Sequence, residues 1–238
     1  MPVIIVLSLR FPLMRRMDSV HGRFLPMARE SGLAAQHASD AATIRTIYDG
    51  WSNTYDTDTE IWGYEAPAVA ARLLAARTTP DVQVLDVGCG TGKVGAALQS
   101  LGYHDVFGVD VSSASLDLAV ATGAYRALNE EDFTALPTSL TDASFTALIC
   151  VGVMTYFPDV EAVCREFCRI VEPHSMIVLT QRSDLFGTRN TQQALDRVAG
   201  EGLWNIVDVS GAKPYLPGHD EYRTIDVHYC VFERTSTT

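Results

Sequence analysis

Apolar residues in this chain gather in short runs that alternate with segments of helical spacing. The runs are rich in β-branched and aromatic residues, and they predict strands over 82–87, 106–109, 125–128, 145–153, 176–180, 204–209 and 224–232. Strands that alternate with helices predict a mostly parallel sheet with helices on both faces. Only the turn-rich stretch 211–219 separates the last two strands, which predicts that they pair antiparallel.

Two helices are predicted ahead of the first strand. After Asp40, a residue suited to cap a helix, apolar side chains recur at helical spacing: Ile44, Ile47, Tyr48, Trp51 and Tyr55. A second helix follows Glu65, with Pro67 tolerated in its first turn. Later helices are predicted after Ser112 or Ser113, after Asp159 and over 188–200. We therefore expect one folded domain over 39–238, with a helical segment over 39–80 and an α/β core over 81–234.

Residues 1–38 are expected to form a disordered extension outside the folded domain. The apolar run 3–9 is interrupted by Arg10 and is too short for a bilayer span, which takes about 20 apolar residues. It also lacks the basic segment and the cleavage site of a secretory signal. The arginine-rich start loosely resembles a mitochondrial presequence, so a mitochondrial location is the alternative to the cytoplasmic one that we expect.

The charge balance argues against a nucleic-acid partner. The net charge is −11, although residues 1–29 hold five arginines and only Asp18 as an acidic residue, so the rest is more acidic still. Non-specific binding to nucleic acid depends on Lys and Arg at phosphates. The cysteines form no C-x-x-C pair and have no histidine at zinc-ligand spacing, so no metal site is predicted and reduced thiols are expected. We also expect a monomer with no membrane partner.

A glycine turn follows the first predicted strand and opens a helix. Its backbone N–H groups and the helix dipole would suit a carboxylate or a phosphate. A P-loop is excluded, because Val87 stands in place of its first glycine and Val94 in place of its hydroxyl residue. The dinucleotide-binding motif G-x-G-x-x-G matches only in part, because Lys93 occupies the place of its third glycine. What remains is D-x-G-x-G-x-G, formed by Asp86, Gly88, Gly90 and Gly92.

With this pattern the chain resembles the class I S-adenosylmethionine (SAM) dependent methyltransferases, over about residues 44–234. The resemblance implies SAM as the cofactor and a Rossmann-like, seven-stranded sheet, mostly parallel with an antiparallel last strand. The stretches 48–51 and 64–67 also resemble the methyltransferase-like proteins of the Williams–Beuren region. Two departures from the family pattern are Thr146, where an Asp is usual, and residues 172–175, where a Pro-Gly-Gly turn is usual.

The resemblance also implies where the cofactor binds. Asp110 is expected to bind the ribose hydroxyls, and Asp132 with Phe133 the adenine. Aromatic residues of the segment 39–80 are expected to form a lid over the cofactor. The full set of expected cofactor contacts is Asp86, Gly88, Cys89, Gly90, Gly92, Asp110, Val111, Asp132, Phe133, Val151, Tyr48, Trp51 and Tyr55.

The reaction implied is an in-line displacement that transfers a methyl group to a small molecule, in preference to a protein side chain. An oxygen or nitrogen acceptor can need a base, and the weak candidates are Tyr156, His174 and His228. Arg182 follows the fifth strand, at the edge where open α/β sheets bind ligands, so it is placed to pair an acidic substrate. The alternatives left open are a non-catalytic SAM-binding or scaffold module and, more distantly, a nicotinamide enzyme.

Overall fold

The computed structural model describes residues 40–236, so the predicted extension, residues 1–38, lies outside them. The helices are α2 (Ala41–Ile61), α3 (Ala66–Ala75), α4 (Lys93–Ser100), α5 (Ser113–Ala121), the 3₁₀ helix η1 (Met154–Tyr156), α6 (Val160–Ile170), α7 (Ser183–Thr188) and α8 (Thr191–Gly200). The strands are β1 (Val84–Val87), β2 (Val106–Asp110), β3 (Ala127–Glu130), β4 (Phe145–Cys150), β5 (Val171–Arg182), β6 (Trp204–Val209), β7 (Lys213–Pro214) and β8 (Asp226–Arg234).

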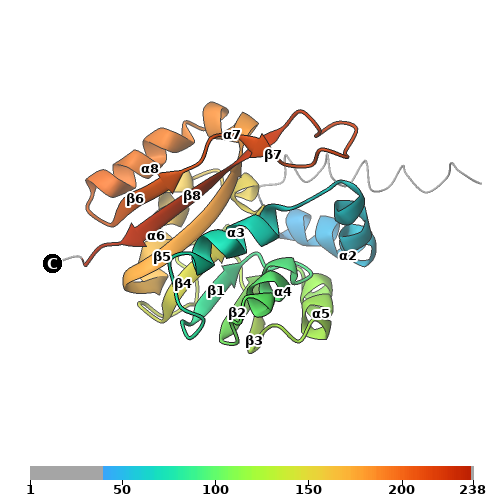
Figure 1. Cartoon of the computed structure of the whole chain (residues 1–238), viewed down its shortest axis with the longest axis horizontal. Coiled ribbons are helices and arrows are strands. Elements are labelled where there is room, and N and C mark those ends of the chain that lie inside the picture. Colours follow the sequence, from blue (N-terminus) through green and yellow to red (C-terminus); the bar gives the residue numbers. More distant parts are fainter. Residues whose placement is uncertain (1–39, 237–238) are drawn as a thin grey trace, which may run out of the picture.

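The strands form a single sheet in the order β3-β2-β1-β4-β5-β8-β6, with β7 paired to β8 (Figure 1). The first five of these strands are parallel, and β8 runs antiparallel to both β5 and β6. This confirms the predicted Rossmann-like sheet and its antiparallel last strand. Within residues 40–236 the sheet has eight strands instead of seven, because the short β7 pairs with the start of β8.

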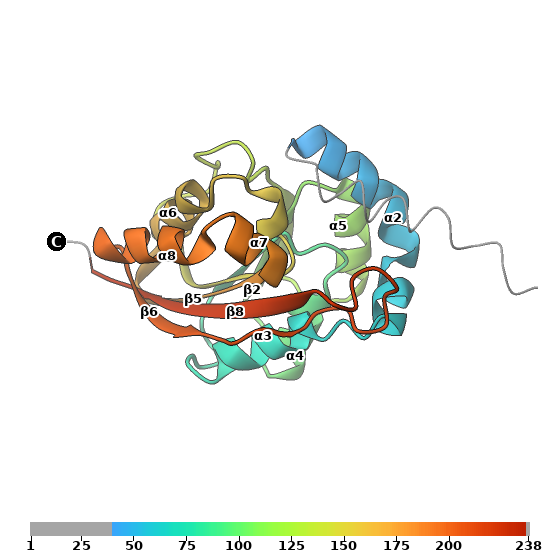
Figure 2. The same ribbon diagram turned by 90° about the horizontal axis from the view of Figure 1, so that it is seen from above.

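Helices cover both faces of the sheet, as Figure 2 shows with the sheet seen edge-on. One face carries α6 and α8 over a core that includes Phe167, Trp204 and Phe232. The other carries α3 and α4 over a core that includes Leu74 and Leu98. Burial of apolar surface on both faces explains why the central strands read as continuous apolar runs.

Several element boundaries differ from the sequence predictions. The predicted helix 188–200 begins three residues later, as α8, because Asn190 at its N-cap adopts a left-handed conformation, and the preceding α7 was not predicted. Strand β5 extends well beyond the predicted 176–180. Strand β3 lies two residues later than predicted, which leaves Tyr125 outside the strand. The predicted caps are confirmed at Asp40, Ser112 and Asp159, whose side chains each accept a backbone N–H.

A tyrosine links β1 to α4 beneath the glycine turn. The Tyr125 hydroxyl donates to Oδ2 of Asp86 at 2.7 Å and accepts from the N–H of Gly95 at 3.0 Å. Gly92, at the N-cap of α4, has no side chain to cap the helix. The Tyr125 hydroxyl instead accepts one of the N–H groups in the first turn of α4, which have no partner within the helix. A Cβ on Gly95 would lie 2.3 Å from the ring of Tyr125. Only glycine therefore fits between α4 and this ring.

Gly95→Ala is expected to lower the free energy of unfolding by about 1–3 kcal/mol, because the added methyl group displaces Tyr125 from Asp86. Gly200→Ala is the matched control, since Gly200 also lies in a helix but a Cβ there meets nothing within 4 Å. The control should be neutral or stabilising by up to about 1 kcal/mol. Urea unfolding measures both values, and equal effects of the two substitutions would contradict this account.

Burial raises the pKa of Asp86 to about 7, although its hydrogen bond from Tyr125 opposes the rise. The folded protein therefore holds this proton more tightly than the unfolded chain does. The resulting stability is complete below about pH 4 and is lost as the pH rises through about 7. Asp86→Asn removes this titration, so the variant should gain stability relative to the wild type between pH 5 and pH 8. Urea unfolding of the cofactor-free proteins across this range tests it, and a difference that does not change with pH would refute it.

Candidate functional site

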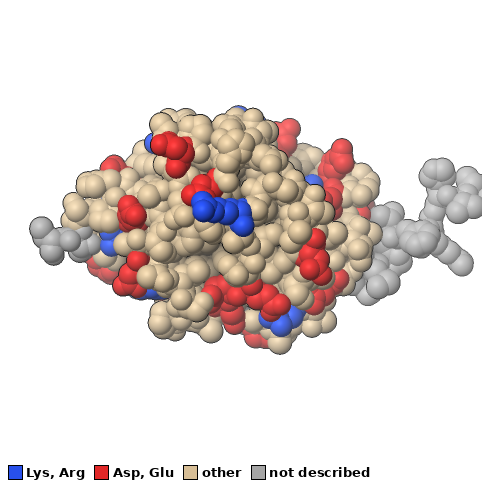
Figure 3. Space-filling model, turned by 90° about the horizontal axis from the view of Figure 1, so that it is seen from below, with Lys and Arg blue, Asp and Glu red and all other residues tan. Residues whose placement is uncertain are grey.

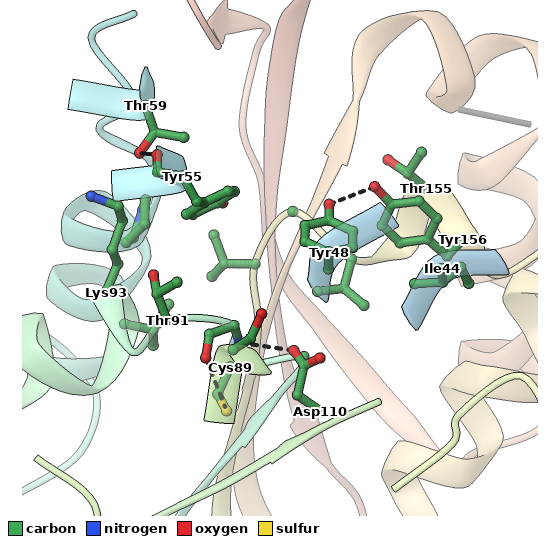
Figure 4. A pocket seen from close by; sticks show the side chains of 18 of the residues that line it. Ile44, Tyr48, Tyr55, Thr59, Cys89, Thr91, Lys93, Asp110, Thr155 and Tyr156 are labelled. Atoms are coloured by element: carbon green, nitrogen blue, oxygen red, sulfur yellow. Dashed lines mark hydrogen bonds between the residues drawn. The ribbon is translucent and has the colours of Figure 1, made fainter. Parts of the chain in front are cut away.

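A pocket lies at the carboxyl ends of the parallel strands, between the sheet, α2 and the segment 215–222 (Figure 4). The N–H of Gly218 donates to the carbonyl oxygen of Trp62 at 3.0 Å and so joins this segment to the chain just after α2. The strand order brings the turn after β1 between the ends of β2 and β4. Residues far apart in the sequence therefore meet at one edge of the sheet, as is typical of ligand sites in open α/β sheets.

The glycine turn and Asp110 form one half of the pocket. Oδ2 of Asp110 accepts from the N–H of Gly90 at 2.8 Å, and Oδ1 accepts from the N–H of Ser112 at 2.9 Å. Burial raises the pKa of Asp110, although these backbone hydrogen bonds oppose the rise. A Cβ built on Gly90, which has a φ of 53°, meets no atom within 4 Å, so the backbone there is open to a ligand.

Most of the predicted cofactor contacts line this pocket. They are Tyr48, Trp51, Tyr55, Gly88, Cys89, Gly90, Asp110, Val111, Phe133 and Val151. Asp86, Gly92 and Asp132 do not line it. Asp86 is fully buried below the turn. Oδ1 of Asp132 accepts from the N–H and the hydroxyl of Thr134, and the neighbouring Glu131 lines the pocket instead.

Polar contacts hold α2 over the half of the pocket formed by the glycine turn and Asp110. Arg45 donates to the carbonyl oxygen of Val111 at 2.7 Å. Asp49 accepts from the Ser112 hydroxyl at 2.6 Å, and Asp56 accepts from the Thr91 hydroxyl at 2.6 Å. These contacts were not predicted from the sequence, although Arg45, Asp49 and Asp56 recur at i, i+4 and i+11, a spacing that places them on one face of a helix.

Tyrosine side chains surround the other half of the pocket. The hydroxyls of Tyr48 and Tyr156 lie 2.6 Å apart and point toward one another (Figure 4). The hydroxyls of Tyr64 and Tyr215 lie over Gly152, where a Cβ would come within 2.7 Å and 3.4 Å of them. Burial raises the pKa of each of these tyrosines. Their hydroxyls therefore stay protonated at neutral pH.

The candidate catalytic residues divide into two groups. Tyr156 and Arg182 line the pocket, whereas His174 and His228 do not. His228 lies 2.9 Å from the carbonyl oxygen of Ser210 and packs on another ring, and His174 is a mostly exposed residue near the start of β5. Neither histidine therefore lies at the pocket, although the sequence offered both as candidate bases.

His219 lines the pocket and was not singled out from the sequence. Its Nδ1 accepts backbone N–H groups of Glu221 and Tyr222 at 3.0 Å and 3.2 Å. Its ring packs against Trp62 at a centroid distance of 4.5 Å. No periodic pattern marks residues in such a loop, so only the folded chain reveals this position.

The part of the chain from 40 to 236 contains no group of His, Cys, Asp and Glu side chains placed to hold a metal ion. All five cysteines are free and buried. Burial raises the pKa of Cys89, Cys150 and Cys164, which keeps them as thiols. No helix among the same residues is long and apolar enough to cross a bilayer.

Comparison with known proteins identifies the family. Residues 85–179 match the family model described as a methyltransferase domain. The chain is 31% identical over 196 residues to human methyltransferase-like protein 27, and the aligned region covers 79% of each protein. This match confirms the resemblance to the methyltransferase-like proteins of the Williams–Beuren region.

Solved structures share the fold. A SAM-dependent methyltransferase from Methanosarcina mazei superposes with a TM-score of 0.55 at 18% identity, covering 68% of this chain and 97% of that one. A geranyl diphosphate C-methyltransferase from Streptomyces coelicolor, solved with S-adenosyl-L-homocysteine, gives a TM-score of 0.53 at 15% identity, covering 69% and 78%.

SAM is the cofactor of this family. The half of the pocket formed by the glycine turn and Asp110, called the cofactor half below, has residues that fit it. The open backbone at Gly90 can approach a ligand, and the carboxylate of Asp110 suits the vicinal hydroxyls of a ribose. The aromatic ring of Phe133 lines the same half. From its relatives and its fold, the chain belongs to the SAM-dependent methyltransferases.

Proposed function

We propose that this methyltransferase transfers the methyl group of SAM to a small molecule bound in the tyrosine-lined half of the pocket. The observation that carries this proposal is the continuity of the two halves under one cover, formed by α2 and the segment 215–222. Tyr156, His219 and Tyr222 line the acceptor half and are each less than a tenth exposed. Such depth suits a small acceptor better than a side chain on the surface of a folded protein.

The residues of the cofactor half would hold SAM in place. Asp110 would accept from the ribose hydroxyls, Phe133 would pack against the adenine, and the open backbone at Gly90 would lie against the cofactor. Bound SAM supplies an electrophilic methyl group on a sulfonium. The contribution of the protein is to hold the acceptor in line with that methyl group and to exclude water.

The tyrosines of the acceptor half would act as hydrogen-bond donors and as apolar walls. Because burial raises the pKa of Tyr48 and Tyr156, neither hydroxyl is suited to remove a proton at neutral pH. Their mutual hydrogen bond fixes the ring of Tyr156 against α2. These two residues would therefore orient the acceptor.

The surface charge also supports a small-molecule acceptor. On the face shown in Figure 3, acidic side chains are spread widely and basic side chains form only small groups. The net charge of the chain is −11. A phosphate backbone would be repelled by such a surface, so nucleic acid is not proposed as the acceptor.

Asp110→Ala is expected to weaken SAM binding by about 10- to 100-fold, because charged hydrogen bonds to the ribose are lost. Asp105→Ala is the control, since Asp105 precedes the same strand but forms an exposed ion pair with Arg126 at 2.6 Å. Isothermal titration calorimetry measures both affinities, with circular dichroism to verify folding. Wild-type affinity in a folded Asp110→Ala protein would show that this carboxylate does not hold the cofactor.

Incubation with methyl-labelled SAM tests the acceptor class. A cell extract is separated into a small-molecule fraction and a protein fraction, and mass spectrometry locates the label. The label is expected in the small-molecule fraction, and Asp110→Ala should lower its transfer at a SAM concentration near the dissociation constant of the wild type. Label found only in protein, or SAM binding without any transfer, would overturn the proposed acceptor class.

A further inference from the structure

We propose that the methyl acceptor carries a carboxylate group, and that Arg182 binds this group at the β5 end of the pocket. This inference rests on the proposed function, because it concerns the acceptor half of the same site. It names the chemical class of the substrate: a monoanionic carboxylic acid with an apolar, preferably aromatic, body.

The position of Arg182 favours an acceptor contact over a cofactor contact. Arg182 ends β5, whereas Asp110 ends β2, and β1 and β4 lie between these strands. Neighbouring strands are about 4.8 Å apart, so the two strand ends lie roughly 14 Å from each other. Arg182 lines the pocket and is only 8% exposed. A buried cation thus lies on the far side of the pocket from the proposed ribose site.

The exposure of its ion-pair partner directs the charge of Arg182 inward. Two guanidinium nitrogens of Arg182 lie 3.1 Å and 2.6 Å from the carboxylate oxygens of Asp184. The Asp184 side chain is 42% exposed, whereas that of Arg182 is 9% exposed. Water screens an exposed carboxylate far more than a buried guanidinium. The guanidinium of Arg182 therefore lies in the wall of the pocket, whereas Asp184 does not line the pocket.

Phenol groups surround this cation. The guanidinium carbon of Arg182 lies 5.1 Å from the centroid of the Tyr222 ring. Burial raises the pKa of Tyr156, Tyr215 and Tyr222, although the charge of Arg182 opposes the rise. Protonated phenols donate hydrogen bonds, and a carboxylate accepts several. This corner therefore offers an anion both a positive charge and donors, while the aromatic rings suit an apolar body.

A single cation suits a monoanion better than a phosphate ester. The other Lys or Arg that lines the pocket, among the described residues, is Lys93, which belongs to the cofactor half and pairs with Asp56 at 3.4 Å. A dianionic phosphate would meet one guanidinium that already has a carboxylate partner. The charge balance at Arg182 thus favours a carboxylate.

A purely structural salt bridge is the competing interpretation, and substitution of Asp184 separates the two. If the ion pair only holds the start of α7, Arg182→Gln and Asp184→Asn should change carboxylate binding in the same direction. If Arg182 binds a carboxylate, Asp184→Asn removes a carboxylate that competes with the acceptor for the guanidinium and strengthens binding, whereas Arg182→Gln weakens it. The two substitutions then act in opposite directions.

The experiment titrates benzoate, benzamide and phenyl phosphate into the protein saturated with S-adenosyl-L-homocysteine, and it follows binding by NMR. Benzoate should bind more tightly than benzamide or phenyl phosphate. Arg182→Gln should weaken benzoate binding about tenfold and leave benzamide unchanged, and Asp184→Asn should strengthen benzoate binding several-fold. Arg182→Lys, which keeps the charge, should retain part of the affinity.

Arg197→Gln is the matched control, because it removes one positive charge from an exposed side chain of α8 that pairs with Glu161 of α6. It should leave benzoate binding unchanged. Equal binding of benzoate and benzamide, tighter binding of phenyl phosphate, or weaker benzoate binding in Asp184→Asn would each overturn the proposal. The affinity for S-adenosyl-L-homocysteine, measured in every variant, verifies that the cofactor half is intact. Because binding needs no turnover, this outcome is independent of whether methyl transfer to a small molecule is found.

Discussion

The hydroxyl of Tyr125 is the contact on which the glycine turn depends. It lies between the buried carboxylate of Asp86, at the end of β1, and the N–H of Gly95, in the first turn of α4. The Cβ-free surfaces of Gly95 and Gly108 make room for its ring, since a Cβ at either glycine would come within 3 Å of it. The strand and the helix on either side of the turn are thus held by one side chain from outside the turn. Asp86 therefore lies beneath the turn, where it accepts from Tyr125, and it does not line the pocket.

Above the turn, Asp110 and α2 complete the arrangement. The two oxygens of Asp110 bind N–H groups from the turn after β1 and from the loop after β2, so the carboxylate joins these two loops directly. Asp49 and Asp56 of α2 then bind hydroxyls in the same two loops. Helix α2 and Asp110 are therefore coupled through shared loops, because a shift in either loop moves a contact of α2 and a contact of Asp110.

Asp110 and Arg182 both line the pocket, and each is stabilised by a different kind of partner. Asp110 is stabilised by backbone N–H groups, which are fixed dipoles of the fold. Arg182 is stabilised by Asp184, which faces solvent. Removing a guanidinium from water is costly, and here the partner lies outside the cavity while the cation lies within it. The tyrosine-lined half of the pocket thus has a buried cation in its wall, in a chain whose net charge is −11.

Local pattern alone was enough to predict the sheet, the caps at Asp40, Ser112 and Asp159, and the turn at Gly88–Gly92, because periodicity and glycine spacing act over a few residues. With the family resemblance, it also indicated SAM and Asp110. Only the tertiary structure showed that Glu131 lines the pocket and Asp132 does not, because neighbouring residues differ in the direction of their side chains. It also showed that His228 lies outside the pocket, where it packs against Phe186. The tyrosine-lined half of the pocket joins α2, η1, the end of β5 and the segment 215–222. No sequence spacing connects these segments, since the order of strands in space brings them together.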